Sequence, residues 1–345
     1  MASVTHTVER FGDAPAEWDA FVRFAERGTQ CHLWGWKSVI ERVLDHECLY
    51  LAARAPDGRV EGVLPLVRVS SRLFGSYLVS MPFLNYGGAV GSDRAVQALV
   101  ARAIELARRD DIELLEMRSR NPLPVELPVS HRKITVVRDL TPGDPGQVWD
   151  TLRAKVRSQV RRPQKEGIVV RFGPDQVGPF FEVFSRHMRD LGTPTQSRRL
   201  FEALVDVFPA QVWFGCAYDG PRAVAAGCGF RWNGEFEMTW AASLARYNAV
   251  APNMLLYWAF MERAAQQGVA AFNFGRCTPG SGTHRFKQQW GGRDVPLWWY
   301  QHTAGERSAT PSPHDRSFSW GPRVWKRLPL PIANILGPRV VRLIP

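Results

Sequence analysis

The sequence predicts a protein that mixes helices and strands, α/β in the broad sense and α+β in the narrower one. It consists of two similar domains in tandem, each with a mixed, mostly antiparallel sheet flanked by helices. One observation is the stretch ECLYLAARAPDGRVEGVLPLVRV (47–69), which has two apolar strand patterns separated by a turn signal at Asp57. A second is QVWFGCAYDGPRAVAAGCGFRW (211–232), which repeats this plan with its turn at Asp219. A chain of 345 residues is long enough for two domains of ordinary size.

The elements around each hairpin follow the same order. Two amphipathic helical patterns come first, PAEWDAFVRFAERG and LWGWKSVIERVL in the first half, PFFEVFSRHMRDLG and SRRLFEALVDVF in the second. Further strands follow in GSYLVSMPFLNYGGAV and GEFEMTWAASLA, and each half then has a helix, at 93–109 or 252–267. The strands IELLEMRS and VAAFNFGR close the two halves, and an additional helix is expected at 146–163. Because the order matches over six elements, we interpret the halves as a duplication.

The turn-rich stretch HRKITVVRDLTPGDPG marks the boundary between the halves. We therefore predict an N-terminal domain over 1–140, a C-terminal domain over 141–303 and a basic, proline-rich tail over 304–345.

The composition is that of an ordinary globular protein, with 45% hydrophobic and 22% charged residues. No apolar run is long enough for a spanning helix, and the first residues lack the layout of a signal peptide, so we expect a cytoplasmic protein. The cysteines have no spacing typical of a zinc site, and we expect them to be reduced and buried: they stand at 31, 48, 216, 228 and 277.

The formal net charge of +11 favours partners that carry phosphate, which include nucleic acids, nucleotide-linked substrates and anionic lipid surfaces. Residues 153–171 concentrate seven cations against one acid, and Arg157 and Arg161 lie on one stripe of the predicted helix. The stripe is either a solvated face or a track for the phosphates of a tRNA acceptor arm or a lipid diphosphate.

The stretch NFGRCTPGSGTHRFKQQWGG (273–292) contains the most distinctive candidate site. Thr283 is expected to be the N-cap of a short helix, with free backbone amides facing outward from the glycine-rich turn. Phe286 and Trp290, four residues apart, are expected to form its buried stripe.

His284 and Lys287 share another side of this helix, and Lys287 is expected to reach back over the exposed amides. Together with Arg276, at the end of the preceding strand, they predict an electropositive nest for a phosphate, a carboxylate or a developing oxyanion. The alternative is a positively charged surface turn.

The order helix, helix, antiparallel strands, helix, strand is that of the acyltransferase fold of the GNAT superfamily. Two copies with the phrases LPLVRVSSRLFGSYLVSMPFLNYGG, LRAKVRSQVRRPQKEG and FNFGRCTPGSGTHRFKQQWGG resemble the FemAB family, in particular its branch associated with exosortase/PEP-CTERM systems. The resemblance covers residues 1–303 and the basic end. It implies transfer of an amino acid from aminoacyl-tRNA to an amine on a cell-wall precursor, and a role in extracellular polymer or envelope assembly.

The resemblance also implies roles for single residues. Lys287 matches the lysine of the family's FK-x-x-aromatic-G phrase, which implies contact with the reacting groups, and it is the predicted catalytic residue. Trp34 and Lys37 match an N-terminal W-x-x-K, which implies that they hold the acceptor's phosphates; a surface lysine is the alternative.

Three further residues are candidates for substrate binding. Arg198 begins a helix after a Gly-Thr-Pro turn, a position that suits anion capture. Tyr257 lies off the apolar stripe of PNMLLYWAFMERA and could reach the cleft, with core packing as the alternative. Asn253 ends the stretch RYNAVAPN, which stands where GNAT enzymes have the Q/R-x-x-G-x-G/A turn for coenzyme A. Ala249 replaces the first glycine of that turn, which favours aminoacyl-tRNA over acyl-CoA.

No Ser-His-Asp order, carboxylate pair or metal-ligand spacing is evident, and we expect neither a metal nor a permanently bound cofactor. Glu235, Glu237 and Asp294 are candidate bases, and nothing in the sequence distinguishes among them.

From 316 to 345 the chain has six cations, no acid and several prolines. The prolines divide this range into short apolar and basic segments, which either lie on an anionic membrane surface or pack over the second domain. The sequence thus predicts an aminoacyl or acyl transferase, cytoplasmic or peripheral at the inner face of the membrane. Its donor would be charged tRNA or acyl-CoA, and its acceptor an envelope or exopolysaccharide precursor, free or lipid-linked. The alternatives are a CoA-dependent N-acyltransferase and a non-catalytic scaffold that binds a phosphorylated glycan lipid.

Overall fold

The computed structural model describes residues 6–71, 75–303 and 321–344. The described part of the chain divides into two compact units, each with its own sheet. The part of the predicted tail from 304 to 320 lies outside the described residues.

Unit 1 contains a sheet in the order β1-β2-β3-β4-β6-β15-β7, with β5 paired to β3. Strands β4 and β6 are parallel, whereas β2, β3 and β4 are antiparallel neighbours. Its strands are β1 (Thr7–Arg10), β2 (Glu47–Arg54), β3 (Val60–Ser71), β4 (Gly75–Ser80), β5 (Val90–Gly91), β6 (Leu114–Ser119), β7 (Val129–Ser130) and β15 (Trp298–Thr303). Its α-helices are α1 (Pro15–Phe24), α2 (Gly35–Val39) and α3 (Asp93–Arg109).

Unit 2 contains a sheet in the order β14-β8-β13-β12-β11-β10-β9, in which β12 and β13 are parallel. Its strands are β8 (Ile134–Asp139), β9 (Val169–Phe172), β10 (Val212–Asp219), β11 (Arg222–Trp232), β12 (Glu235–Ser243), β13 (Ala271–Cys277) and β14 (Arg293–Pro296). Its helices are α4 (Pro145–Asp150), α5 (Ala154–Lys165), α6 (Val177–Leu191), α7 (Arg198–Val207), α8 (Pro252–Gln266), α9 (Gly282–Gln288), α10 (Gly321–Trp325) and α11 (Leu330–Val341).

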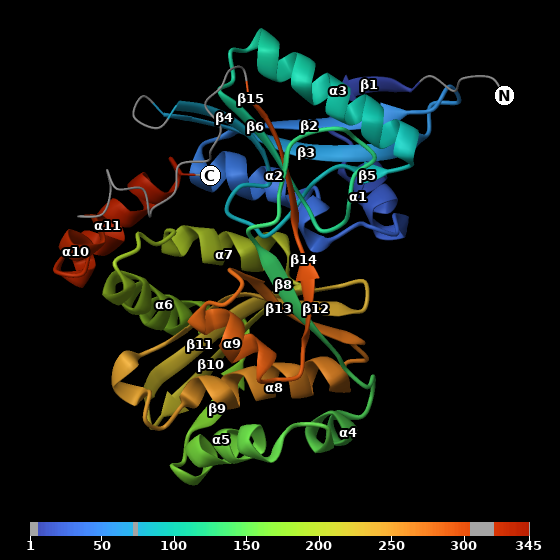
Figure 1. Cartoon of the computed structure of the whole chain (residues 1–345). Helices are drawn as coiled ribbons and strands as arrows, with labels where there is room; N and C mark the ends of the chain where they lie inside the picture. Colours follow the sequence, from blue (N-terminus) through green and yellow to red (C-terminus); the bar gives the residue numbers. More distant parts are fainter. Residues whose placement is uncertain (1–5, 72–74, 304–320, 345) are drawn as a thin grey trace. The chain divides into compact units, whose positions relative to one another are not determined.

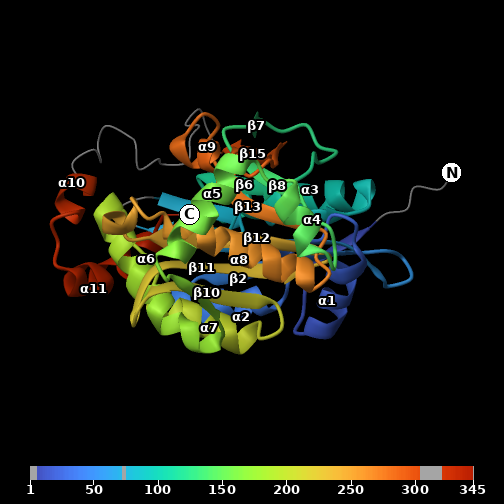
Figure 2. The same cartoon turned by 90° about the horizontal axis from the view of Figure 1, so that it is seen from below.

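The helices of unit 2 form layers on its sheet. Helix α6 packs on β10, β11 and β12 from one face, and α8 packs on the same strands from the other (Figure 1). Helices α4 and α5 pack on α8 (Figure 2). The core on the α8 side is largely aromatic and includes Phe236, Phe260, Phe272, Phe274 and Trp290.

The predicted hairpins and long helices are present. The turns of the β2–β3 and β10–β11 hairpins place Gly58 and Gly220 at φ of +87° and +55°, a region that glycine enters without a steric penalty. The predicted helix at 93–109 is α3. The helix predicted over 146–163 is instead divided into α4 and α5, because Arg153 has an extended backbone (φ −59°, ψ 143°) and starts the second helix anew.

Two strands join a different sheet from the one that their place in the sequence suggests. The stretch predicted as a turn-rich boundary contains strand β8, which pairs antiparallel with β13 of unit 2. Strand β15, in the range predicted for the C-terminal domain, pairs antiparallel with β6 of unit 1 (Figure 1). Both are apolar enough to be buried, with Val136 and Tyr300 inside their cores. Burial of an apolar strand is visible in its sequence, but the identity of its partner is not.

Candidate functional site

A β-bulge interrupts β13 just before its end. Asn273 pairs with Val137 of β8 and Arg276 pairs with Thr135, so β13 has one more residue than β8 between these pairs. Gly275, inside the bulge, has a φ of +74°. The bulge turns backbone carbonyls of β13 toward α9, as the contacts of Lys287 show.

The side chain of Asn273 holds the bulge in place. It is fully buried, and its Oδ1 accepts hydrogen bonds from Thr135 Oγ1 and from the backbone N–H of Gly275 (2.9 Å). Its Nδ2 donates to Glu235 Oε1 at 3.0 Å. One amide thus satisfies three groups around the bulge, which fixes the backbone that follows.

Lys287 lies in α9 and is only 4% exposed. Its Nζ donates to the carbonyl oxygens of Gly275 (2.6 Å) and Arg276 (2.9 Å), which uses two of its three N–H donors. Burial lowers the pKa of Lys287 from 10.5 to about 8, while Cys277 and Glu237 act in the opposite direction and Arg276 adds to the lowering. An ammonium with this pKa is still mainly protonated at neutral pH.

The start of α9 differs from the expectation. Ser281, not Thr283, is the N-cap, since its side chain accepts from the N–H of His284 (3.1 Å) and Thr283 is exposed. The N–H of Gly280 donates to His284 Nδ1 (3.0 Å), so the predicted nest of open amides is partly filled by this histidine. His284 Nε2 in turn lies 2.9 Å from Asp294 Oδ2.

The predicted buried stripe of α9 is correct only in part, because the buried residues of α9 itself are His284 and Lys287. Phe286 is partly buried against the core of unit 2, and Trp290, which follows the end of α9, is fully buried in that core. Tyr257 of α8 lies among these rings, with its centroid 5.0 Å from that of Phe286 and 5.8 Å from that of Phe274. Tyr257 therefore occupies the core position that was the alternative for it, and the aromatic cluster ties α9 to α8.

We expect Lys287 to make stability depend on alkaline pH. Below about pH 8 the folded and unfolded states both hold the proton, and the folded state carries the full burial penalty. Between about pH 8 and 10.5 the unfolded state binds more protons, so stability rises with pH. The free energy of unfolding of the wild type, relative to Lys287→Met, should rise by about 3 kcal/mol over this range in urea titrations. A difference that is flat or falls with pH would contradict the buried ammonium.

A second prediction concerns Asn273. Asn273→Ala should reduce the free energy of unfolding by about 1–3 kcal/mol, because it leaves buried partners of the bulge without their hydrogen bonds. Thr135→Val, which removes one of these donors at nearly constant volume, should have an effect of the same sign, as measured by urea unfolding. Unchanged midpoints in both variants would show that the bulge does not depend on this network.

The turn before α8 offers few amides to a pyrophosphate. The N–H groups of Asn248, Val250 and Ala251 already donate to carbonyls within the turn, and Pro252 has none. Ala251 has a φ of +60°, a conformation that favours glycine. Asn253 follows, half-buried in the first turn of α8. This geometry differs from an open phosphate-binding turn.

The other cationic candidates of unit 2 lie on other elements. Arg157 donates to the carbonyl of Asp150, and Arg161 stacks over Trp149 at 5.2 Å. Helix α5, which carries both arginines, packs on α8. Arg198, in the first turn of α7, is 59% exposed and pairs with Glu202 at 2.8 Å. Their contacts place these arginines on helix surfaces, whereas Lys287 and the backbone of Arg276 meet directly.

In unit 1 the W-x-x-K phrase forms a compact pair. Lys37 Nζ lies 5.3 Å from the ring centroid of Trp34 and 3.1 Å from Glu41 Oε2. Trp34 itself is buried against Trp18 and Tyr50. The lysine therefore stands at the edge of an aromatic core.

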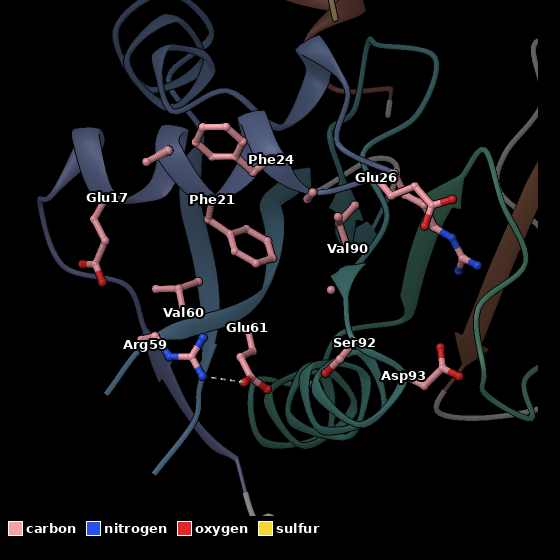
Figure 3. A pocket seen from close by; sticks show the side chains of 14 residues that line it. Glu17, Phe21, Phe24, Glu26, Arg59, Val60, Glu61, Val90, Ser92 and Asp93 are labelled. Atoms are coloured by element: carbon pink, nitrogen blue, oxygen red, sulfur yellow. Dashed lines mark ion pairs between the residues drawn. The ribbon is translucent and has the colours of Figure 1, made fainter. Parts of the chain in front are cut away.

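A hollow of about 670 Å³ lies elsewhere in unit 1, between α1, the start of β3 and β5 (Figure 3). Its lining combines apolar side chains such as Phe21 and Val60 with the carboxylates of Glu17, Glu26 and Glu61. None of the predicted site residues lines it, and its carboxylates disfavour phosphates.

Two residues of the site were not distinguished in the sequence. Glu237 is 3% exposed, and it is close enough to Lys287 to raise the pKa of the lysine. The other two candidate bases have different partners, since Glu235 bonds to Asn273 and Asp294 bonds to His284. Asn273 was missed, although a polar residue inside the apolar strand AFNFG is a usable signal. Among the described residues, no group of three or more His, Cys, Asp or Glu is placed to hold a metal ion.

Residues 151–288, which include α9 and Lys287, match the family model of the acetyltransferase (GNAT) domain. A tandem GNAT protein from the clavulanic acid biosynthesis pathway has a similar structure, with a TM-score of 0.53 at 14% identity over 89% of this chain and all of that one. The chain has the tandem GNAT fold.

Two other solved structures are similar over most of their length. FemX matches with a TM-score of 0.65 at 15% identity, over 85% of this chain and 97% of FemX. L-PGS from Bacillus licheniformis matches with a TM-score of 0.54 at 13% identity, over 95% and 98% of the two chains. No curated protein matches by sequence. The matched domain supports an acyltransferase.

Proposed function

We propose that the protein is a FemAB-like aminoacyl transferase, which forms an amide bond on an amine of a cell-envelope or exopolysaccharide precursor. The observation that carries this proposal is the buried ammonium of Lys287, held by the carbonyls of Gly275 and Arg276 inside the matched GNAT domain. The similarity of the fold to FemX and the FK-x-x-W-G phrase support the FemAB-like reading.

In the proposed reaction the acceptor amine attacks the ester carbonyl of aminoacyl-tRNA. The C–N bond forms, the negative charge moves to the carbonyl oxygen, and the C–O bond to the ribose then breaks. The amine loses one proton and the departing ribose hydroxyl gains one, so charge and atoms balance. The third N–H of the Lys287 ammonium would donate to the oxyanion. The pKa of Lys287, about 8, keeps this ammonium protonated at neutral pH.

The start of α8 supports aminoacyl-tRNA over acyl-CoA as the donor. The N–H groups of the turn before this helix already donate to carbonyls of the same turn, and Pro252, the first residue of the helix, has no N–H to offer a pyrophosphate. Charged tRNA is a cytoplasmic molecule, so we place the reaction on that side of the membrane. We assign Lys37 to the phosphates of the acceptor, as the family resemblance implies. We assign Arg198 separately to anion binding, because it stands at the start of α7. The second candidate, a CoA-dependent N-acyltransferase, is favoured by the description of the matched domain.

Transfer of labelled amino acid from bulk charged tRNA into a membrane-and-precursor extract tests the proposal, with acyl-CoA as a parallel donor. We expect transfer from charged tRNA that RNase abolishes. Transfer from acyl-CoA alone would favour the second candidate. The absence of transfer from either donor, in an extract shown to contain acceptors, would favour a non-catalytic scaffold.

A further inference from the structure

The exposed apolar side chains of the described residues are concentrated at one place. In the part of the chain that the structure describes, eight large apolar side chains are exposed, and five of them lie at the end of α6 or in α10 and α11. We call these five residues the tail surface: Leu191 (54% exposed), Val324 (51%), Ile332 (45%), Ile335 (60%) and Leu336 (38%). Contiguous exposed apolar side chains mark an interaction site more often than scattered ones do.

Both tail helices are anchored on α6, beside which they lie in Figures 1 and 2. Arg189 donates to the carbonyl of Leu328 at 3.0 Å, and Gly192 packs so closely on Pro322 that a Cβ would come within 2.6 Å of its carbonyl oxygen. Leu191 therefore lies next to α10.

Helix α11 has a packed face and an outward face. Ala333 is 2% exposed, and Gly337 lies against Thr195, where a Cβ would come within 2.9 Å of the carbonyl oxygen. Ile332 and Ile335 are exposed on the other side. The predicted alternatives of packing and surface binding are therefore compatible, since small residues pack inward and large apolar ones stay outside.

The tail helices carry cations and no acid, while the acids beside them, Asp190 and Asp45, pair with Arg189 and Arg342. Residues 316–345 contain no acid. Arg323, Lys326, Arg327 and Arg339 are exposed, and within the described ranges none of them forms an ion pair with a carboxylate. Exposed apolar side chains next to unpaired cations are typical of segments that lie in the interface of an anionic membrane.

We propose that the tail surface binds an anionic lipid membrane, with its apolar side chains in the acyl boundary and its cations at the lipid phosphates. A protein interface of standard size buries about 800 Å² on each partner, which five partly exposed side chains do not supply. No helix in the described ranges is both long and apolar enough to cross a membrane, so this contact would be peripheral. The proposal is independent of the acyl-transfer reaction.

Flotation of the full-length protein with lipid vesicles tests the proposal. Vesicles of phosphatidylcholine with 30% phosphatidylglycerol are compared with phosphatidylcholine alone, at low and at physiological salt. The net charge of +11 by itself favours anionic vesicles, so the deciding variant must keep the charge. Ile332→Ser with Ile335→Ser does so, and Val129→Ser with Val169→Ser is the matched control on exposed positions elsewhere.

We expect the Ile332→Ser/Ile335→Ser protein to partition about tenfold more weakly onto anionic vesicles, and the control to bind like the wild type. Replacing Arg323, Lys326 and Arg327 by glutamine should weaken binding further and remove its salt dependence in part. Equal binding of the wild type and the isoleucine variant would overturn the proposal. The proposal would also be overturned if light scattering showed a dimer for the wild type and a monomer for the isoleucine variant, because the tail surface would then bind a second copy of the chain.

Discussion

Lys287→Met is expected to reduce the rate of acyl transfer by about 10²–10³-fold while the protein stays folded. The ammonium is a preorganised donor, since two backbone carbonyls and burial fix its position before the substrate arrives. Methionine keeps most of the side-chain volume and removes the charge. The loss should therefore appear in the single-turnover rate of a variant that is still folded at neutral pH.

Lys133→Met is the matched control, because it removes a lysine from unit 1 that belongs to none of the proposed sites. It should transfer at the wild-type rate. A Lys287→Met protein that transfers as fast as this control would exclude Lys287 from the chemistry.

Trp290→Ala is expected to reduce the free energy of unfolding by about 3–5 kcal/mol. Trp290 is fully buried, and its ring lies beside those of Tyr257, Phe274 and Phe286. Its removal leaves a cavity between α8, α9 and β13, and it releases the C-terminal end of the segment that positions Lys287. We expect the transfer rate to fall in the same variant.

Trp290→Phe should recover more than half of the lost stability, since a ring still fills the site. Urea unfolding of the three proteins measures both effects. A loss below about 1 kcal/mol in Trp290→Ala would mean that α9 is held by other contacts.

The elements that local patterns control were predictable from the sequence. The glycine turns of both hairpins, helix α3 and the burial of Trp290 follow from turn chemistry and periodicity. Strands β8 and β15 were missed, and their partners were not predictable, because an apolar strand shows that it is buried but not on which sheet edge.

The candidate site was predictable in its residues but not in its geometry. The phrase THRFKQQWGG identified Lys287, yet the sequence placed it over open amides, whereas in the structure it bonds to carbonyls. That difference arises from the bulge at Asn273 and the cap at Ser281, and both depend on hydrogen bonds between residues whose spacing in three dimensions the sequence does not give.

The pH dependence of single-turnover transfer, measured for the wild type and Lys287→Met on the same substrates, tests the central claim most directly. The ratio of the two rates cancels the ionisation of the acceptor amine and leaves the contribution of Lys287. If the ammonium stabilises the oxyanion, this ratio is constant below about pH 8 and falls above it, as Lys287 loses its proton. A ratio that rises through pH 8 would make the neutral amine the active form, and a ratio near one at every pH would remove Lys287 from the reaction.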